Sequence, residues 1–417
     1  MKVLEIDGNV PLTGTIHIGG AKNSAVALIP AAILTDEKVT LTNVPEITDI
    51  NVLSDILDYL NVSVNSASGS LVINPENMVN KVIPDELSNR LRASYYFMAS
   101  LLAKYKEVKM YFPGGCKIGS RPIDQTLKVF KALGADIEEE DFLFTIKAQE
   151  LVGSEITLDM PSVGATVNAL IASCLAKGET ILHNAAREPE IVDLADMLNK
   201  MGAKITGAGN STIKITGVNK LHGCFHNIIP DRIEAGTYII LGALIGNYLR
   251  IENINPEHIK SLLDKMQDMG CDLEINDDNV VVNAYDNITG TEVKTAGYPG
   301  FPTDLQQPFV TLLTQAKGKS IVTENIYENR FMNIPYLNKM GANISVKERE
   351  ATILGSNKLH GEVVEATDLR AGASLLLAAL KASGHTTINN IEYLLRGYEE
   401  VIEKLSNVGA KIELKEI

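Results

Sequence analysis

The hexapeptide KMGAKI at residues 200–205 recurs along the chain, and its spacing decides the fold. The related copies are ALGADI at 132–137, DMGCDL at 268–273, KMGANI at 339–344, NVGAKI at 407–412 and, more weakly, YLNVSV at 59–64. Successive glycines of the clear copies are 68, 68, 71 and 68 residues apart. A glycine after a helix favours a left-handed C-cap, and asparagine, here Asn61, is the next-best residue. The pattern predicts six units, each with a helix, a cap and a strand.

Each unit also has an earlier half, which is clearest in DLRAGASLLLAALKASGHTTINNI at 368–391. An apolar helix in this stretch ends at Gly384, and an alternating strand follows it. The matching helices at 25–34, 237–246 and 373–380 are apolar on all sides, which is typical of buried helices. The second helix of a unit, as in 399–409, is amphipathic and is expected to cover the outside.

Six such units predict an α/β protein made of two pseudo-threefold domains with three units each. We place the first domain at 20–229 and the second at 1–19 plus 230–417. The first strand, before Gly19, has no unit of its own, so we expect it to complete the second domain. The chain then crosses twice between the domains.

The composition narrows the possible partners and the location. The chain has 417 residues, and 38 Lys and Arg against 52 Asp and Glu give a net charge of −14. This charge argues against nucleic acid or an anionic membrane as a partner. The four cysteines are far apart and form no CxxC pair, which fits a reduced chain. With no signal-peptide pattern and no stretch long enough for a membrane span, we predict a soluble, cytoplasmic protein.

Cationic residues occupy four of the six positions where the buried helices begin. These positions are Lys22, Arg92, Ser162, Arg232, Asp304 and Arg370, at intervals of 70, 70, 70, 72 and 66 residues. A second set follows the first strands and comprises Cys116 with Arg121, Arg187, Arg330 and Arg396. Equivalent positions of a repeat lie at equivalent places, and helix N-termini favour anions. We therefore predict a ligand with several negative charges. The alternative is a set of salt bridges with Asp49, Glu188, Glu190 and Asp368.

The loop PGGCKIGSRPID at 113–124 places a thiol beside two cations. Lys117 and Arg121 lie within five residues of Cys116, so a reactive thiol with a low pKa is one interpretation and an ordinary surface loop is the other. GGAKNS at 19–24 lacks the spacing of a nucleotide-hydrolysing phosphate loop. His222, Cys224 and His226 alternate as metal ligands on a strand do, but an incidental strand pattern is the favoured interpretation. Cys174 and Cys271 are interpreted as core residues.

Ten long motifs spread over the whole chain resemble the UDP-N-acetylglucosamine 1-carboxyvinyltransferase family. They are GGAKNSA at 19–25, RAS at 92–94, PGGCKIGSRPID at 113–124, PSVGAT at 161–166, NAAREPEIVD at 184–193, PDRIEAGT at 230–237, GFPTDLQ at 300–306, ENRFMNIP at 328–335, DLRAGASL at 368–375 and LRGYEE at 395–400. The resemblance implies an inside-out α/β barrel fold with the active site in the cleft between two domains. It implies transfer of the enolpyruvyl group of phosphoenolpyruvate to the 3′-hydroxyl of UDP-N-acetylglucosamine (UDP-GlcNAc) with release of phosphate. This is the first committed step of bacterial peptidoglycan synthesis, and no metal or organic cofactor is implied.

The resemblance also assigns residues to roles. Cys116 is the acid that protonates phosphoenolpyruvate, the thiol that epoxide inhibitors of the fosfomycin type alkylate, and Asp304 is the base at the sugar hydroxyl. Lys22, Arg121 and Arg396 hold phosphoenolpyruvate. The positions that match nucleotide-sugar contacts are Asn23, Arg92, Arg121, Pro122, Ile123, Asp124, Gln125, Ser162, Val163, Gly164, Asp304 and Ile326. Arg330 and Arg370 join the substrate-binding set as members of the recurring cations.

Two positions depart from the family pattern, Thr126 where many members carry His and Met160 where some carry Lys. Both bear on nucleotide affinity. Two other functions remain open. One is the shikimate-pathway enolpyruvyl transferase, which shares the fold, and the other is a weakly active paralogue that binds UDP-GlcNAc and regulates the pathway.

Overall fold

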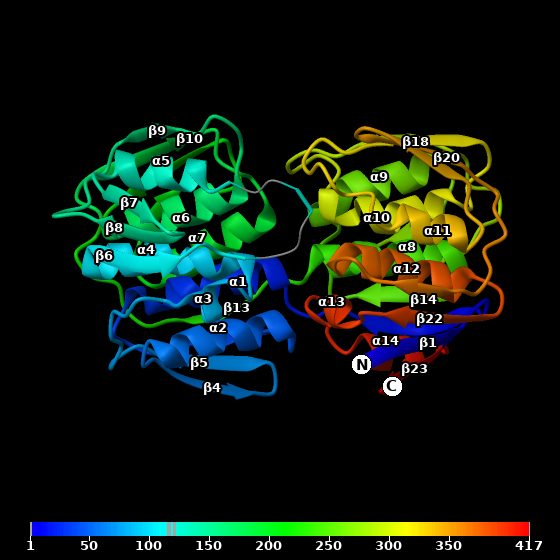
Figure 1. The fold of residues 1–417 in the computed structure, drawn as a ribbon, viewed down its shortest axis with the longest axis horizontal. Coiled ribbons are helices and arrows are strands. Elements are labelled where there is room, and N and C mark those ends of the chain that lie inside the picture. Colours follow the sequence, from blue (N-terminus) through cyan, green and yellow to red (C-terminus); the bar gives the residue numbers. More distant parts are fainter. Residues whose placement is uncertain (1, 115–117, 120–121, 417) are drawn as a thin grey trace. The chain divides into compact units, whose positions relative to one another are not determined.

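The protein is shown in Figure 1 as a computed structural model that describes residues 2–114, 118–119 and 122–416. The chain forms two compact units. The middle unit comprises 20–116 and 121–229, and the terminal unit comprises 1–19, 117–120 and 230–417. The boundaries drawn from the sequence differ at 117–120, because the described residues 118 and 119 group with the terminal unit. In the described part of the chain, no helix has the length and apolar character needed to cross a membrane.

Three buried helices, one from each repeat, form the core of the middle unit: α1 (Lys22–Ala31), α4 (Tyr96–Tyr105) and α6 (Val163–Ser173). α4 contacts both α1 and α6. The other helical segments are η1 (Ala32–Leu34), α2 (Thr48–Tyr59), α3 (Asp85–Ser88), η2 (Arg92–Tyr95), α5 (Asp124–Ala132) and α7 (Pro189–Lys200). Because α1, α4 and α6 are apolar on nearly all sides, they are stable only inside a layer of other elements.

Three small sheets surround these helices. The first has the order β13 (Phe225–Asn227), β3 (Val39–Thr42), β5 (Ser70–Asn74), β4 (Ser63–Ala67). The second is β6 (Glu107–Tyr111), β8 (Leu143–Lys147), β7 (Asp136–Glu140). The third is β11 (Lys204–Thr206), β12 (Thr212–Thr216), β10 (Glu179–His183), β9 (Glu155–Thr157). Strands such as β10 bury alternate residues, so one sheet face packs on the helical core and the other faces out.

The terminal unit repeats this plan around α8 (Arg232–Ile245), α10 (Thr303–Leu313) and α12 (Leu369–Lys381), which lie between sheet layers in Figure 1. Its first two sheets are β15 (Asp272–Ile275), β16 (Asn279–Asn283), β14 (Gly246–Glu252), β2 (Leu12–His17), and β17 (Glu292–Lys294), β18 (Lys319–Thr323), β20 (Glu350–Leu354), β19 (Ile344–Lys347). The third is β21 (Val363–Glu365), β22 (His385–Asn389), β1 (Lys2–Asp7), β23 (Lys411–Glu416). The remaining helices are η3 (Pro256–Ile259), α9 (Lys260–Asp268), α11 (Ile334–Lys339), α13 (Glu392–Leu395) and α14 (Val401–Asn407).

The strands at the start of the chain complete sheets of the C-terminal half. β1 runs antiparallel between β22 and β23, with Leu4 opposite both Ile388 and Leu414. β2 runs parallel to β14, with Ile16 opposite Ile251. Helices inside sheets in both units make this an inside-out α/β fold, which confirms the predicted fold class.

The caps predicted from the repeat are present at all six junctions. The φ angles of Gly134, Gly202, Gly270, Gly341 and Gly409 lie between 84° and 101°, and that of Asn61 is 64°. Only glycine adopts this left-handed conformation without a steric penalty, and asparagine is the most tolerant alternative. The recurring hexapeptide is therefore a recurring helix end.

Candidate active site

Two arginines hold the carboxylate of Asp304 in the terminal unit. Asp304 lies in the first turn of α10, Arg370 lies in the first turn of α12, and Arg330 follows β18. Arg330 Nη2 donates to Asp304 Oδ1 at 2.6 Å, and Arg370 Nη2 donates to Asp304 Oδ2 at 3.0 Å. Both arginine side chains are buried, whereas that of Asp304 is 27% exposed. The fold thus brings three predicted site residues into one cluster.

These guanidinium groups determine the protonation state of Asp304. Burial alone raises the pKa of a carboxyl group, because it disfavours the charged form. The charges of Arg370 and Arg330, with the hydrogen bonds that both donate, outweigh burial and hold the pKa of Asp304 well below its usual range. Asp304 is therefore ionised at neutral pH, and it is a weak proton acceptor while both arginines hold it.

Tyr398 connects Arg370 to the segment that carries Arg396. Arg370 Nη1 donates to the Tyr398 hydroxyl at 3.1 Å, and that hydroxyl shares a hydrogen bond of 2.9 Å with Thr237 Oγ1. The guanidinium of Arg370 also lies 5.6 Å from the centroid of the Tyr398 ring. Arg396 is half-buried at the C-cap of α13, two residues before Tyr398. Contacts of a buried tyrosine therefore tie α8 and α12 to this segment.

Ile326 is presented by a turn directly after β18. Its side chain is 40% exposed, as a ligand contact requires. Its backbone N–H donates to Glu324 Oε1 at 2.8 Å, and the N–H of Tyr327 donates to the same oxygen at 3.1 Å. The turn that presents Ile326 is thus organised by the carboxylate of Glu324.

In the middle unit, Lys22 in the first turn of α1 lies against Asp49 of α2. Lys22 Nζ is 2.7 Å from Asp49 Oδ2, and the Asp49 side chain is 2% exposed. Asp49 is one of the four acidic residues considered as salt-bridge partners of the recurring cations, and the structure pairs it with Lys22. This salt bridge fixes the position of the ammonium group, which leaves a role in anion binding open. The neighbouring Asn23 is half-buried in the same turn.

Tyr95 contacts both Arg92 and the start of α6. Arg92 Nη1 donates to the carbonyl of Pro113 at 3.1 Å, and the guanidinium lies 5.5 Å from the Tyr95 ring centroid. The Tyr95 hydroxyl approaches Gly164 so closely that a Cβ on Gly164 would be 1.5 Å from it. The Gly164 position therefore needs glycine. Just before it, Ser162 Oγ accepts from Ala165 N at 3.3 Å and caps α6.

The predicted site residues around the start of α5 divide into buried and exposed ones. Gln125 is buried and anchors α5, because its Nε2 donates to Asp159 Oδ2 at 2.9 Å and its Oε1 accepts from Asp159 N at 2.9 Å. Asp124 and Pro122 are exposed, and Ile123 is buried. Exposed Val163, at the start of α6, completes the predicted set in this unit.

Cys116 and Arg121 lie outside the described residues, so their predicted roles stay predictions. Two residues between them are described. The carbonyl of Ile118 accepts from Asn329 N at 3.0 Å, and a Cβ on Gly119 would be 2.1 Å from Glu328 Oε2. Residues 118 and 119 therefore pack against the segment that leads to Arg330.

Of the two positions that depart from the family pattern, Thr126 is buried in α5 and Met160 is 62% exposed.

Asp368, proposed as a salt-bridge partner, instead caps α12. Its Oδ1 accepts from the backbone N–H groups of Arg370 and Ala371 at 2.9 and 3.0 Å.

The alternating pattern of His222, Cys224 and His226 is not one of neighbours on a strand, because only His226 lies in β13. His226 Nε2 is 2.8 Å from Asp193 Oδ1, and its Nδ1 is 3.2 Å from Lys200 Nζ. Within residues 2–114, 118–119 and 122–416, no group of three or more His, Cys, Asp or Glu is arranged to hold a metal ion. Cys174 and Cys271 are buried, as predicted, and burial raises the pKa of each thiol to about 12.

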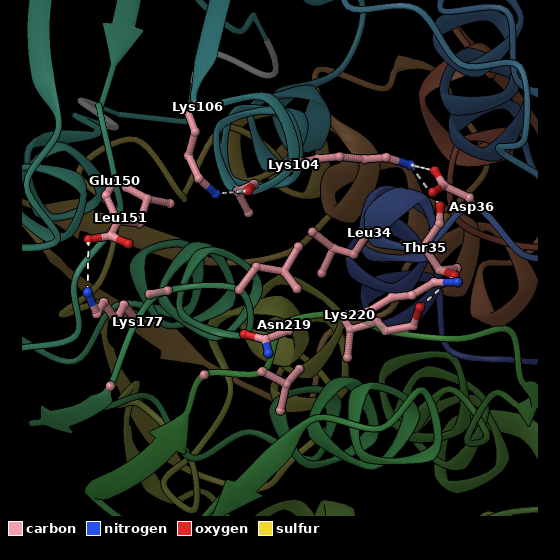
Figure 2. A pocket seen from close by; sticks show the side chains of 17 residues that line it. Leu34, Thr35, Asp36, Lys104, Lys106, Glu150, Leu151, Lys177, Asn219 and Lys220 are labelled. Atoms are coloured by element: carbon pink, nitrogen blue, oxygen red, sulfur yellow. Dashed lines mark hydrogen bonds and ion pairs between the residues drawn. The ribbon is translucent and has the colours of Figure 1, made fainter.

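A cavity of about 530 Å³ lies at the C-terminal ends of α1, α4 and α6, opposite the end that carries the predicted site residues (Figure 2). Its lysines already have partners. Lys104 pairs with Asp36 at 2.7 Å and Lys177 with Glu150 at 3.6 Å, while Lys106 donates to a carbonyl at the end of α4. Cations at helix C-termini stabilise the helices themselves. None of the predicted site residues that the structure describes lines this cavity.

Sequence reasoning missed the residues that hold the site residues in place. They are Tyr95, Gln307, Glu324 and Tyr398. Gln307 Nε2 donates to Asp368 Oδ2 at 3.4 Å. Tyr95, Gln307 and Tyr398 lie within or beside quoted motifs, but neither charge nor spacing distinguishes them from core residues. Glu324 has a signal in the repeat, because it is a carboxylate at a position where four other units carry asparagine.

Residues 6–405 match the family described as EPSP synthase (3-phosphoshikimate 1-carboxyvinyltransferase). The chain belongs to the EPSP synthase family. Among its relatives, a Bacillus subtilis protein named UDP-N-acetylglucosamine 1-carboxyvinyltransferase 2 is 49% identical over 413 residues, which is 99% of this chain and 96% of that protein. A Listeria monocytogenes protein with the same name is 48% identical over 409 residues, 98% of this chain and 97% of that protein.

Solved structures of the EPSP synthase family agree with the fold. The enolpyruvyl transferase NikO of Streptomyces tendae superposes with a TM-score of 0.90 at 27% identity, covering 99% of each chain. EPSP synthase of Acinetobacter baumannii superposes with a TM-score of 0.77 at 19% identity over both full chains, a likeness of fold alone. The resemblance inferred from the sequence motifs is confirmed by these relatives.

Proposed function

We propose that the protein is a UDP-N-acetylglucosamine 1-carboxyvinyltransferase. It transfers the enolpyruvyl group of phosphoenolpyruvate to the 3′-hydroxyl of UDP-GlcNAc and releases phosphate, the first committed step of peptidoglycan synthesis. The observation that carries this proposal is the 48–49% identity, over nearly the full chain, to relatives with that name. We also propose that the enzyme is bacterial and acts in the cytoplasm.

The chemistry explains why the site needs cations, an acid and a base. A proton adds to C3 of phosphoenolpyruvate, the sugar oxygen adds to C2, and phosphate then leaves. By resemblance Cys116 supplies the proton, and Lys22, Arg121 and Arg396 hold the carboxylate and phosphate groups. Support for Lys22 comes from its salt bridge, since an ammonium group held at a fixed position needs no reorganisation in the transition state.

The contacts of Asp304 add a condition to its role as base. A carboxylate that accepts from two buried guanidinium groups binds a proton weakly, so it removes one from a sugar hydroxyl poorly. We infer that the negative charges of the substrates draw Arg330 or Arg370 away from Asp304 during the reaction. Its pKa then rises towards the usual range, because one compensating charge has been removed.

A single assay distinguishes the proposed function from the two alternatives, the shikimate-pathway transferase and the regulatory paralogue. Phosphate release is measured with phosphoenolpyruvate plus either UDP-GlcNAc or shikimate 3-phosphate. We expect turnover with UDP-GlcNAc only. Turnover with shikimate 3-phosphate alone would identify the shikimate-pathway activity, and binding of UDP-GlcNAc without turnover would identify a regulatory paralogue.

A further inference from the structure

Five of the six sheets contain a pair of parallel strands, and a polar residue follows the inner strand of each of these pairs. Parallel strand pairs end in matching registers at Thr42–Asn227, His183–Thr157, Glu252–His17, Asn389–Glu365 and Thr323–Lys294. The residue that follows the first member of each pair is Asn43, Asn184, Asn253, Asn390 and Glu324. The four asparagines have left-handed φ angles of 54° to 58°, and Glu324 is not among the residues with positive φ. One unit thus replaces the shared asparagine by a carboxylate.

The shared asparagine has a structural task that Glu324 does not perform. In three units its Nδ2 donates to a carbonyl beyond the neighbouring strand: Asn43 to Ile228, Asn184 to Leu158 and Asn253 to Ile18, at 2.9, 3.0 and 2.7 Å. In the exceptional unit this bond runs instead from Asn325 Nδ2 to the carbonyl of Thr295 at 3.1 Å. The next residue has taken over the structural bond, so the Glu324 side chain makes other contacts.

The carboxylate of Glu324 is fully buried and accepts four hydrogen bonds. Oε1 accepts from Ile326 N at 2.8 Å, Tyr327 N at 3.1 Å and Thr295 Oγ1 at 2.9 Å. Oε2 accepts from Thr303 Oγ1 at 3.0 Å. In the part of the chain that the structure describes, no ion pair reaches this group. A buried carboxyl group needs hydrogen-bond partners for its oxygens, so this arrangement depends on all four donors.

The partners of Glu324 belong to two parts of the candidate site. One is the turn that presents Ile326, and the other is Thr303, the residue before Asp304 at the start of α10. Asp304 is itself the acidic exception among the six helix starts. Asp304 and Glu324, the two acidic departures from the repeat, therefore lie in the same repeat unit. Thr303 links them, because it precedes Asp304 in the chain and donates a hydrogen bond to Glu324.

We propose that Glu324 is a positioning residue of the transferase reaction, an inference that rests on the proposed function. Its carboxylate orders the backbone that presents Ile326 to the nucleotide sugar, and through Thr303 it fixes the start of the helix that carries Asp304. The chemistry is that of a hydrogen-bond acceptor, and Glu324 itself does not touch the reacting atoms.

Three substitutions separate the two tasks. Glu324→Leu keeps the core filled and removes every acceptor, so we expect KM for UDP-GlcNAc to rise about tenfold, near the upper effect of one hydrogen bond, and kcat to fall. Glu324→Gln keeps one acceptor oxygen for the turn, and its amide can donate to Thr303 Oγ1, so we expect recovery to within about threefold of the parent. Thr303→Val removes only the link to α10 and should lower kcat while KM for UDP-GlcNAc is unchanged.

Asn253→Gly is the matched control at the corresponding position of another repeat. It removes the hydrogen bond from Asn253 Nδ2 to the carbonyl of Ile18, and glycine keeps the left-handed backbone. We therefore expect KM for UDP-GlcNAc to match that of the parent. Amide hydrogen exchange at Ile326 and Tyr327 provides a readout that needs no turnover. We expect faster exchange in Glu324→Leu and parental exchange in Glu324→Gln.

The outcomes are distinguishable. Equal loss of activity in the Leu and Gln variants, or a lower kcat with unchanged KM in Glu324→Leu, would overturn the proposed hydrogen-bond positioning. Unchanged amide exchange in Glu324→Leu would do the same. If instead the parent does not turn over UDP-GlcNAc, the proposed function fails, and the exchange measurement still tests whether Glu324 orders the turn.

Discussion

Replacing Asp304 by asparagine removes the negative charge that pairs with two buried guanidinium groups. A charge-assisted hydrogen bond contributes about 1.5–3 kcal/mol, and breaking a buried ion pair costs about 3–5 kcal/mol. Asp304 is partly exposed, and asparagine retains one acceptor oxygen, so we take the lower end of the range. We expect Asp304→Asn to lower the free energy of unfolding of the terminal unit by about 3 kcal/mol at pH 7.

The difference between parent and variant must depend on pH with a definite sign. The folded-state pKa of Asp304 is depressed, so its contribution to stability is present above the unfolded-state pKa of about 3.9 and is lost as pH falls below it. Each pH unit corresponds to about 1.4 kcal/mol. At pH 3 the parent has lost about 1.2 kcal/mol of this contribution, and asparagine does not titrate. The difference should therefore narrow from about 3 to about 2 kcal/mol.

Urea unfolding followed by circular dichroism at pH 7, 5 and 3 measures this difference. Amide hydrogen exchange in α10 and α12 assigns the affected transition to the terminal unit. Asp264→Asn is a matched control in the same unit. Asp264 and its partner Lys260 are both exposed, so loss of this ion pair should change the free energy of unfolding little. A loss below about 0.5 kcal/mol at pH 7, or a difference that stays constant with pH, would refute the assignment of Asp304 as the counterion of two buried arginines.

Three further predictions concern turnover. Arg396→Ala should lose more than about 1.5 kcal/mol of transition-state stabilisation, measured as kcat/KM for phosphoenolpyruvate, with UDP-GlcNAc affinity little changed; near-parental kcat/KM would remove Arg396 from the site. Cys116→Ala should be almost inactive, whereas Cys116→Asp should keep turnover, resist epoxide inhibitors and show a lower pH optimum, because a carboxyl group titrates below a thiol. An active Cys116→Ala would exclude the acid role. Gly164→Ala should displace the Tyr95 hydroxyl and disturb Arg92, raising KM for UDP-GlcNAc, and an unchanged KM would separate this contact from nucleotide binding.

The architecture was predictable because the repeat fixes backbone conformation. The left-handed caps at Gly134, Gly202 and the other junctions depend on one local property, the absence of Cβ, so sequence alone reveals them. Buried helices that are apolar on all sides indicated which elements lie inside. These local rules were sufficient to predict six units with buried helices, and the family resemblance added the inside-out fold.

The partners of the site residues were less predictable, since they depend on side-chain length and direction. The register placed Asp304 and Arg370 at the same end of a unit, but not Asp304 between Arg370 and Arg330. Likewise, Asp49 was named as a partner and pairs with Lys22, while Asp368 was named in the same way and caps a helix. Identical residue types at similar positions thus have different contacts.

The position of β1 between β22 and β23 has a consequence for the order of the chain. β1 and β23 are antiparallel neighbours, with Lys2 opposite Glu416, so a short turn is enough to join the end of one strand to the start of the other. A circular permutant joined there and opened between Gly19 and Gly20 would read 20–229 first and then 230–416 followed by 2–19. Each unit's main body would then be one continuous segment, joined to the other by a single peptide connection. β1, which comes long before β22 and β23 in the natural order, would then follow both of its partners along the chain.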